Sequence, residues 1–211
     1  MRPLILILFA QEYDELALAS IESSYSEYEF VREGFDLFTF PSNARLLWFD
    51  VELFVKRLAV KYRSRTVAAV ASTHEQFGAL AASLLAEKLG LPGASLQSLL
   101  TAQHKFLARQ IHAKCMPENV PPFCGFRYDA DVRTAVTIDY PVFVKPVKAA
   151  FSVLAKRCKD EAALRAHLKF ALWEKFIIKR LTWPFRRVSA RRIECEIDAD
   201  CFIAEGCVDG A

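Results

Sequence analysis

One apolar run near the amino terminus constrains the fold of this chain more than any other segment. Pro3 to Phe9 is unbroken by any charged residue, which is typical of a strand buried on both faces of a parallel sheet. Together with Arg2 the run superficially resembles a signal peptide, but Glu12, Asp14 and Glu15 lie where a signal peptide stays neutral. We therefore expect a buried first strand and a cytoplasmic protein.

Strand and helix patterns alternate after this run as far as about residue 93. Phe35 to Phe40 and Thr66 to Ala71 are predicted strands. Asp50 can cap a helix between them, and Ser72 or Thr73 can cap the next helix. This order predicts an α/β domain with a doubly wound parallel sheet.

A second, smaller α+β unit is predicted from about residue 101 onward. Its strands show short apolar patterns, and its helices have a polar capping residue or an apolar stripe. The helices are expected at Gln103 to Ala113 and from Asp160 to about Leu172, and the strands at Phe123 to Phe126, Val142 to Lys145 and Ser152 to Arg157.

Composition excludes several classes of protein. A hydrophobic fraction of 53% with 25% charged residues excludes general disorder, and no stretch reaches the ~20 apolar residues of a membrane helix. The six cysteines show no Cys-x-x-Cys spacing, so we expect reduced, mostly buried thiols. The high apolar fraction also predicts exposed apolar surface and self-association.

Charge is distributed unevenly between the two halves. Residues 1–100 hold 9 basic and 12 acidic side chains, a net charge of −3, whereas residues 101–211 hold 19 and 13, a net charge of +6. Part of the excess lies in 174–193, where seven cations alternate with apolar and aromatic residues. We interpret this segment as an insertion: a solvated surface flap first, then a substrate lid or a partner site. Nucleic-acid binding is a further interpretation, although no recognised nucleic-acid motif accompanies the segment. Membrane attachment through Trp183 and Phe185 is another.

Several motifs, in this order and spacing, resemble the ATP-grasp superfamily of carboxylate ligases. None is specific alone. They are Glu87-Lys-Leu-Gly-Leu-Pro-Gly93, the helix bearing Lys105, Met116-Pro-Glu-Asn-Val-Pro-Pro122, Tyr140-Pro-Val-Phe-Val-Lys-Pro146, Phe202-Ile-Ala-Glu205 and Val208-Asp-Gly210.

The resemblance implies a pre-ATP-grasp domain over 1–100, the small ATP-grasp subdomain over 101–200 with the insertion at 174–193, and the start of the hinge and central subdomain over 201–211. Members of the family activate a carboxylate as an acyl phosphate, using ATP and Mg²⁺, for attack by an amine or similar nucleophile. The chain would end before the central metal-binding domain, and so lack the family's Mg²⁺ ligands. We therefore expect ATP and a small carboxylate as ligands of an incomplete site.

By the same resemblance, the ATP site falls on particular residues. Lys105 and Lys145 correspond to the family's two nucleotide lysines, and a flexible ammonium can follow a phosphate physically. Ser152 is a possible phosphate donor. The segment formed by Glu205, Gly206, Cys207 and Val208 would line the adenine.

The sequence departs from the family pattern at two places. His104 stands where aspartate is usual, which removes an anionic partner from the start of the helix. Ala149, Ala150 and Phe151 replace the glycines that let backbone amides close over phosphates. The competing hypothesis is therefore a non-catalytic protein of the same fold that uses the basic insertion to bind a partner or nucleic acid.

Two further groups of residues are candidates for chemistry. Glu194, Glu196, Asp198 and Asp200 are spaced by two, so an extended chain would place them on one face, as a solvated edge or as ligands of a hard cation. His74, with Glu75, follows a predicted strand at the edge of the sheet where doubly wound folds bind ligands. Helix capping accounts for the same residues without a ligand.

Overall fold

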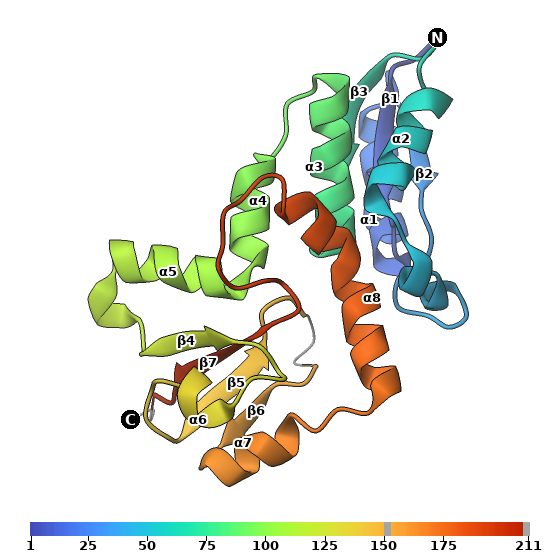
Figure 1. Ribbon diagram of the computed structural model, residues 1–211. Helices are drawn as coiled ribbons and strands as arrows, with labels where there is room; N and C mark the ends of the chain where they lie inside the picture. Colours follow the sequence, from blue (N-terminus) through green and yellow to red (C-terminus); the bar gives the residue numbers. More distant parts are fainter. Residues whose placement is uncertain (150–152, 209–211) are drawn as a thin grey trace. The chain divides into compact units, whose positions relative to one another are not determined.

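The chain folds into two compact units, residues 1–99 and residues 100–211, in a computed structural model that describes 1–149 and 153–208 (Figure 1). The first unit contains a three-stranded parallel sheet, and the second contains a four-stranded antiparallel sheet. The predicted order of an α/β layer followed by an α+β unit is confirmed.

The apolar run predicted as the first strand forms the middle of the first sheet. Strand β1 (Leu4–Leu8) lies between β2 (Glu29–Glu33) and β3 (Val67–Ala71). Leu6 pairs with one residue of each neighbour and is completely buried. A strand with partners on both sides and helices on both faces has no solvent-facing positions, which explains its lack of polar residues.

Three helices cover this sheet. Helix α1 (Glu12–Ser24) follows β1, α2 (Val51–Lys61) follows β2, and α3 (Phe77–Leu89) follows β3. Figure 1 shows α1 on the face opposite to α2 and α3, as right-handed crossovers on both sides of β1 require. Asp50 caps α2 as predicted, because its carboxylate accepts a hydrogen bond of 3.0 Å from the Leu53 amide.

Three details of the first unit differ from prediction. Phe35 to Phe40 is not a strand, because the second strand lies earlier, at β2, and the ring of Phe35 packs against those of Phe9 and Phe49. A 3₁₀ helix (Ser42–Trp48) follows. Helix α1, which the patterns did not predict, begins at the three acidic residues that excluded a signal peptide.

The start of α3 was also predicted wrongly. The helix begins at Phe77 and has no side-chain cap, because both candidate caps are bonded elsewhere. The Ser72 hydroxyl donates to the Leu8 carbonyl at 2.7 Å, and the Thr73 hydroxyl donates to the Asp14 carboxylate at 2.8 Å. These bonds hold the turn after β3 to the carboxyl end of β1 and to the first turn of α1.

The sheet of the second unit has the order β4-β7-β5-β6. Strand β7 (Phe202–Gly206) is the last in sequence, yet it lies between β4 (Phe123–Phe126) and β5 (Val142–Pro146). The short β6 (Lys156–Cys158) forms one edge. Its helices are α4 (Leu96–Gln103), which begins just before the unit boundary, α5 (Lys105–Cys115), α6 (Val132–Ala135), α7 (Glu161–His167) and α8 (Leu172–Ser189), with a 3₁₀ turn at Pro117–Asn119.

The carboxyl-terminal part of this unit differs most from prediction. The helix that Asp160 caps ends at His167 instead of near Leu172. The segment 174–193, interpreted as a solvated flap, is largely the regular helix α8, and Phe185 on its inner face is completely buried. None of the described helices is both long and apolar enough to cross a membrane.

Candidate functional site

The two faces of the second sheet are covered differently. Val142 and Val144 of β5 are completely buried on the face that packs against α6 and α7. On the other face, Phe106 of α5 packs over Ile203 of β7. Phe143 also points to that second face but is 37% exposed, so the part of the face along β5 remains uncovered.

Lys145 lies at the end of this uncovered strip. Its ammonium is 2.5 Å from the Glu205 carboxylate and 5.8 Å from the centre of the Phe143 ring. Lys145 pairs with Ile203 in the sheet register, so Glu205 is its diagonal neighbour on β7. The antiparallel pairing of β5 and β7 thus brings one predicted phosphate lysine against the first residue of the predicted adenine segment.

Glu205 is a buried carboxylate with two cationic partners. Its other oxygen accepts a hydrogen bond of 2.5 Å from the Arg109 guanidinium of α5, and only 5% of the residue is exposed. Burial alone would raise the pKa of Glu205, but the hydrogen bonds from Arg109 and Lys145 outweigh it, so the pKa lies below its usual value. The side chain is therefore a fixed anion that orients both cations.

Arg109 is a residue of this site that the motifs did not reveal. It lies one helical turn after Lys105, and residues at this spacing share a helix face. The spacing was present in the sequence, but basic residues at i and i+4 are common on solvated helices. Only the sheet pairing that places Glu205 opposite α5 distinguishes Arg109 from an ordinary surface cation.

Lys105 is the first residue of α5 and is tied to the segment after β5. Its backbone amide donates to the Val147 carbonyl at 3.2 Å, and its ammonium donates to the Ala149 carbonyl at 2.6 Å. Lys105 therefore contacts Val147 and Ala149, which follow Lys145 by two and four residues in the sequence. Ser152, Ala150 and Phe151 lie outside the described residues.

His104 replaces the family's usual aspartate without loss of the helix cap. The His104 ring accepts a hydrogen bond of 3.3 Å from the Leu107 amide, and the ring stacks on Phe185 of α8. The residue is only 2% exposed, and this burial lowers the pKa of its imidazole. Histidine thus supplies the acceptor that the start of α5 needs, in a neutral form that suits an aromatic neighbour.

The rest of the predicted adenine segment ends the sheet. Gly206 donates its amide to the Pro122 carbonyl at 2.8 Å, which continues the edge beside β4. Cys207 is half-buried, and Val208 is 78% exposed.

The acidic run after α8 is not an extended edge. Residues 194–200 form no strand, and Asp198 and Asp200 bind Arg186 instead, with contacts of 2.9 and 3.1 Å. In 1–149 and 153–208, no group of three or more acidic, histidine or cysteine residues could hold a metal ion. The described residues therefore include no such cluster for a magnesium ion.

His74 has a packing role in the first unit. It is 7% exposed, and its ring lies 5.3 Å from that of Phe38. The ring nitrogen also faces the Gly78 amide at 3.5 Å, near the start of α3. The side chain is therefore part of the turn that leads into this helix.

Comparison of the sequence with protein-family models and with curated proteins found no match. Solved structures do match. An L-amino acid ligase from Bacillus licheniformis is similar at a TM-score of 0.63 and 18% identity, over 99% of this chain and 45% of the ligase chain. The biotin carboxylase domain of the Hydrogenobacter thermophilus 2-oxoglutarate carboxylase, solved with MgADP, is similar at 0.57 and 13%, over 97% and 44%. The D-alanine-D-alanine ligase of Coxiella burnetii is similar at 0.51 and 15%, over 99% and 65%.

The chain thus has the fold of roughly the amino-terminal half of ATP-grasp proteins. It spans less than two-thirds of the length of these solved structures, so the likeness covers a part of that architecture.

Proposed function

We propose that this chain binds ATP on the uncovered strip of its second sheet, as the nucleotide-binding part of an ATP-dependent carboxylate ligase. Lys105 and Lys145 contact the phosphates, and the backbone from Glu205 to Val208 contacts the adenine edge. Phosphoryl transfer depends mainly on positioning and charge neutralisation, so two oriented ammonium groups are the parts that such a site needs first.

The ion pair between Lys145 and Glu205 is the observation that carries this proposal. It joins the end of β5 to the end of β7, with the carboxylate buried and the Lys145 side chain 23% exposed. A second cation, Arg109, holds the same carboxylate. Lys145 is thereby held in place without being covered, which lowers the entropy lost when it binds a phosphate.

The ligase assignment rests on fold likeness and on the ordered motifs. Two of the similar proteins are ligases, and a third was solved with MgADP and bicarbonate. A carboxylate substrate and Mg²⁺ follow for this chain only by that likeness. Since no described residues fit a magnesium site, we propose nucleotide binding for this chain and derive no metal-dependent step for it.

Calorimetric titration with ATP tests the proposal. A chain with both Lys105→Met and Lys145→Met is expected to bind ATP at least about tenfold more weakly, because a hydrogen bond to a charged group contributes roughly 1.5–3 kcal/mol. The matched control carries Lys114→Met and Lys159→Met, which remove the same charge from two exposed positions. The control is expected to bind like the unmodified chain.

Circular dichroism of both double variants confirms that they fold. Equal ATP affinity of the folded Lys105/Lys145 variant and its control would refute the assignment of these lysines. No measurable affinity of the unmodified chain for ATP would refute nucleotide binding itself.

A further inference from the structure

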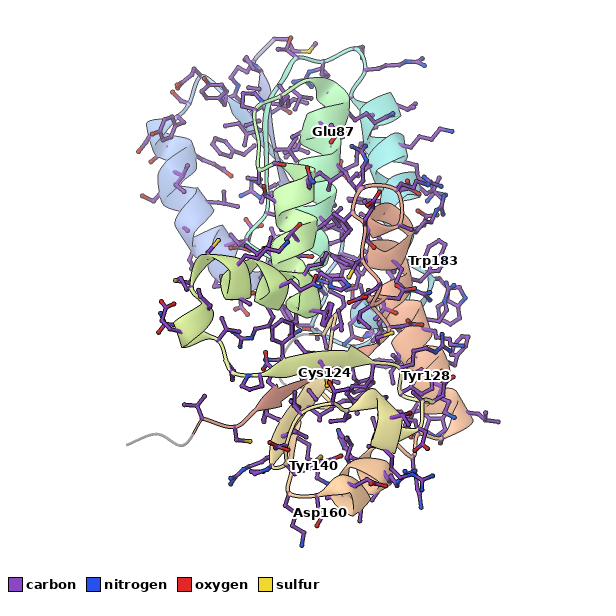
Figure 2. All side chains as sticks on the ribbon, turned by 60° about the vertical axis from the view of Figure 1, so that its left-hand side comes forward. Glu87, Cys124, Tyr128, Tyr140, Asp160 and Trp183 are labelled. Atoms are coloured by element: carbon purple, nitrogen blue, oxygen red, sulfur yellow. The ribbon has the colours of Figure 1, made fainter. Side chains whose placement is uncertain are left out.

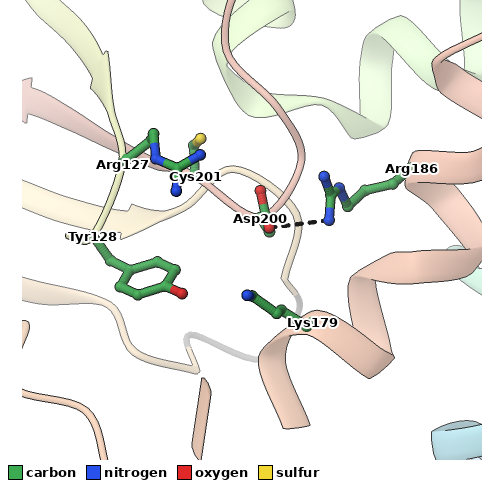
Figure 3. Close-up of a pocket in the computed structure, with 6 residues that line it drawn as sticks. All are labelled: Arg127, Tyr128, Lys179, Arg186, Asp200 and Cys201. Carbon is green, nitrogen blue, oxygen red and sulfur yellow. Dashed lines mark ion pairs between the residues drawn. The ribbon is translucent and has the colours of Figure 1, made fainter. Parts of the chain in front are cut away.

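A polar pocket lies at one end of the sheet of the second unit, where β7 begins. Its volume is about 200 Å³, and Figure 3 shows the side chains that line it. They come from the segment after β4, from α8 and from the segment before β7, and none belongs to the predicted nucleotide site. The lining residues are Arg127, Tyr128, Lys179, Arg186, Asp200 and Cys201.

Helix α8 supplies two cations to this pocket. Lys179 and Arg186 are seven residues apart, which is two helical turns, so both project from one side of the helix. Lys175, one turn before Lys179, places its ammonium 5.7 Å from the centre of the Tyr128 ring. The basic segment that was interpreted as an insertion therefore contributes Lys179 and Arg186 to the lining of this pocket.

Both arginines are already neutralised by carboxylates. Arg186 binds Asp198 and Asp200. Arg127 makes two hydrogen bonds of 3.0 Å to Asp129 through Nε and Nη2, which leaves its Nη1 group outside that pair. These ion pairs fix the guanidinium groups in position, and they leave little of the arginines' net charge for a ligand.

Lys179 and Tyr128 differ from the arginines. In the described part of the chain, neither the Lys179 ammonium nor the Tyr128 hydroxyl has a hydrogen-bond partner or an ion pair. Figure 3 shows the two groups pointing toward one another across the pocket, with the Asp200 carboxylate on one side and the Arg127 guanidinium farther away, beside Cys201. The Asp200 carboxylate in the same lining is engaged by Arg186. Two groups that can each donate a hydrogen bond and that converge on one space are complementary to an oxyanion.

We propose that this pocket binds the carboxylate of a small organic acid. The Lys179 ammonium and the Tyr128 hydroxyl donate to its oxygens, and Arg127 lines the same pocket. A single charge suits the pocket better than a phosphate dianion, because Lys179 is its one uncompensated lining cation and Asp200 repels a second negative charge. At roughly 30 Å³ for each water molecule, the volume equals about six or seven waters, which limits the acid to a few heavy atoms.

This proposal does not depend on the nucleotide site. The pocket is formed where β4 ends and β7 begins, and its residues carry none of the roles proposed for ATP. It can therefore be tested without nucleotide, and either proposal can fail while the other holds.

Titration of the ¹⁵N-labelled full chain with sodium propionate, followed by NMR at constant ionic strength, tests the pocket. Saturable shifts are expected for the amides of residues 127–129, 178–180 and 199–201. Lys179→Met is expected to weaken binding at least about tenfold and Tyr128→Phe a few-fold, since each removes one donor. Lys114→Met, which removes an exposed lysine of α5, is expected to change nothing.

Three results would overturn the proposal. The first is a set of chemical shifts that increase linearly with propionate concentration and do not saturate. The second is an affinity for propionate that Lys179→Met leaves unchanged. The third is tighter binding of inorganic phosphate than of propionate. Lys179 is an exposed residue, so its substitution is not expected to disturb folding, and the remaining amide spectrum verifies this directly.

Discussion

Glu205 combines a structural role with the functional role proposed for it in one side chain. It is buried, it holds Lys145 and Arg109, and it begins the segment proposed to contact adenine. Because both cations share this one carboxylate, its removal is expected to affect the stability of the sheet and the position of Lys145, the lysine proposed to bind phosphate, together.

Glu205→Gln is expected to lower the free energy of unfolding at pH 7 by about 1–3 kcal/mol. The amide retains the shape of the side chain but cannot satisfy two charged donors, and the partial exposure of Lys145 and Arg109 keeps the loss moderate. Since the folded pKa of Glu205 lies below 4.5, its ionised form stabilises the protein above that pH. This stabilisation is lost as pH falls through the folded pKa.

Urea unfolding at neutral pH and below about pH 4 measures this difference. The gap between Glu205→Gln and the unmodified chain is expected to narrow in acid, whereas Glu118→Gln, at an exposed position, should show no gap at either pH. A gap that is independent of pH would show that the charge of Glu205 does not contribute.

His104 shows why a departure from a family pattern needs the structure to be interpreted. From the sequence, histidine in place of aspartate meant the loss of an anionic partner. The folded chain uses the ring as a neutral cap and as a stacking partner of Phe185. A motif comparison cannot predict this, because Phe185 lies far away in the sequence on a helix with no counterpart in the motifs.

At the scale of elements, helix α8 changes most between prediction and structure. The seven cations of segment 174–193 suggested a solvated flap, but one side of the helix is buried in the second unit, with Phe185 completely enclosed and Val188 3% exposed. Two of its cations instead lie near an aromatic face: the guanidinium groups of Arg180 and Arg187 are 5.4 and 5.1 Å from the Trp183 ring. Among the aromatic residues of this segment, Phe185 thus belongs to the core, and Trp183 packs against two cations.

Phe185→Ala is expected to destabilise the second unit by about 3–5 kcal/mol, because it removes a fully buried aromatic side chain and leaves a cavity. Phe176→Ala on the same helix is the control, since Phe176 is 52% exposed, and it should cost less than about 0.5 kcal/mol. Hydrogen exchange at amides of β5 and β7 reports on the second unit alone. Equal effects of the two substitutions would contradict the packing of α8.

Local patterns predicted most of the elements but not their exact limits. The strands β1, β3, β4 and β5 and the cap of α2 follow from short apolar runs and from Asp50, which are properties of neighbouring residues. The second strand of the first sheet and the start of α3 depend on distant partners, as the hydrogen bond from Ser72 to Leu8 shows. The same holds for the site: motifs pointed to Lys145 and Glu205, whereas Arg109 became visible only through the pairing of β5 with β7.

At the scale of the whole molecule, exposed apolar residues at the start of α8 predict self-association. Leu172, Trp173 and Phe176 form one stripe on the first turn and a half of this helix and are 85%, 65% and 52% exposed. Sedimentation velocity is expected to show association that increases with concentration. The double variant Trp173→Ser and Phe176→Ser should reduce it, and Val60→Ser on α2, also at an exposed apolar position, should not.

A single monomeric species at every concentration would contradict this expectation. Association that the double variant leaves unchanged would place the contact elsewhere on the surface.

The position of β7 between β4 and β5 has a consequence for how the protein is made. All strands of the first sheet are complete by Ala71, but Phe126 finds its partner only when Phe202 has been synthesised. At about 5–20 residues per second, a ribosome needs on the order of ten seconds to synthesise the chain from Phe126 to Phe202. From the synthesis of β5 onward, β4 and β5 both lack the strand that joins their edges, so we expect the nascent second unit to require a chaperone after the first has folded.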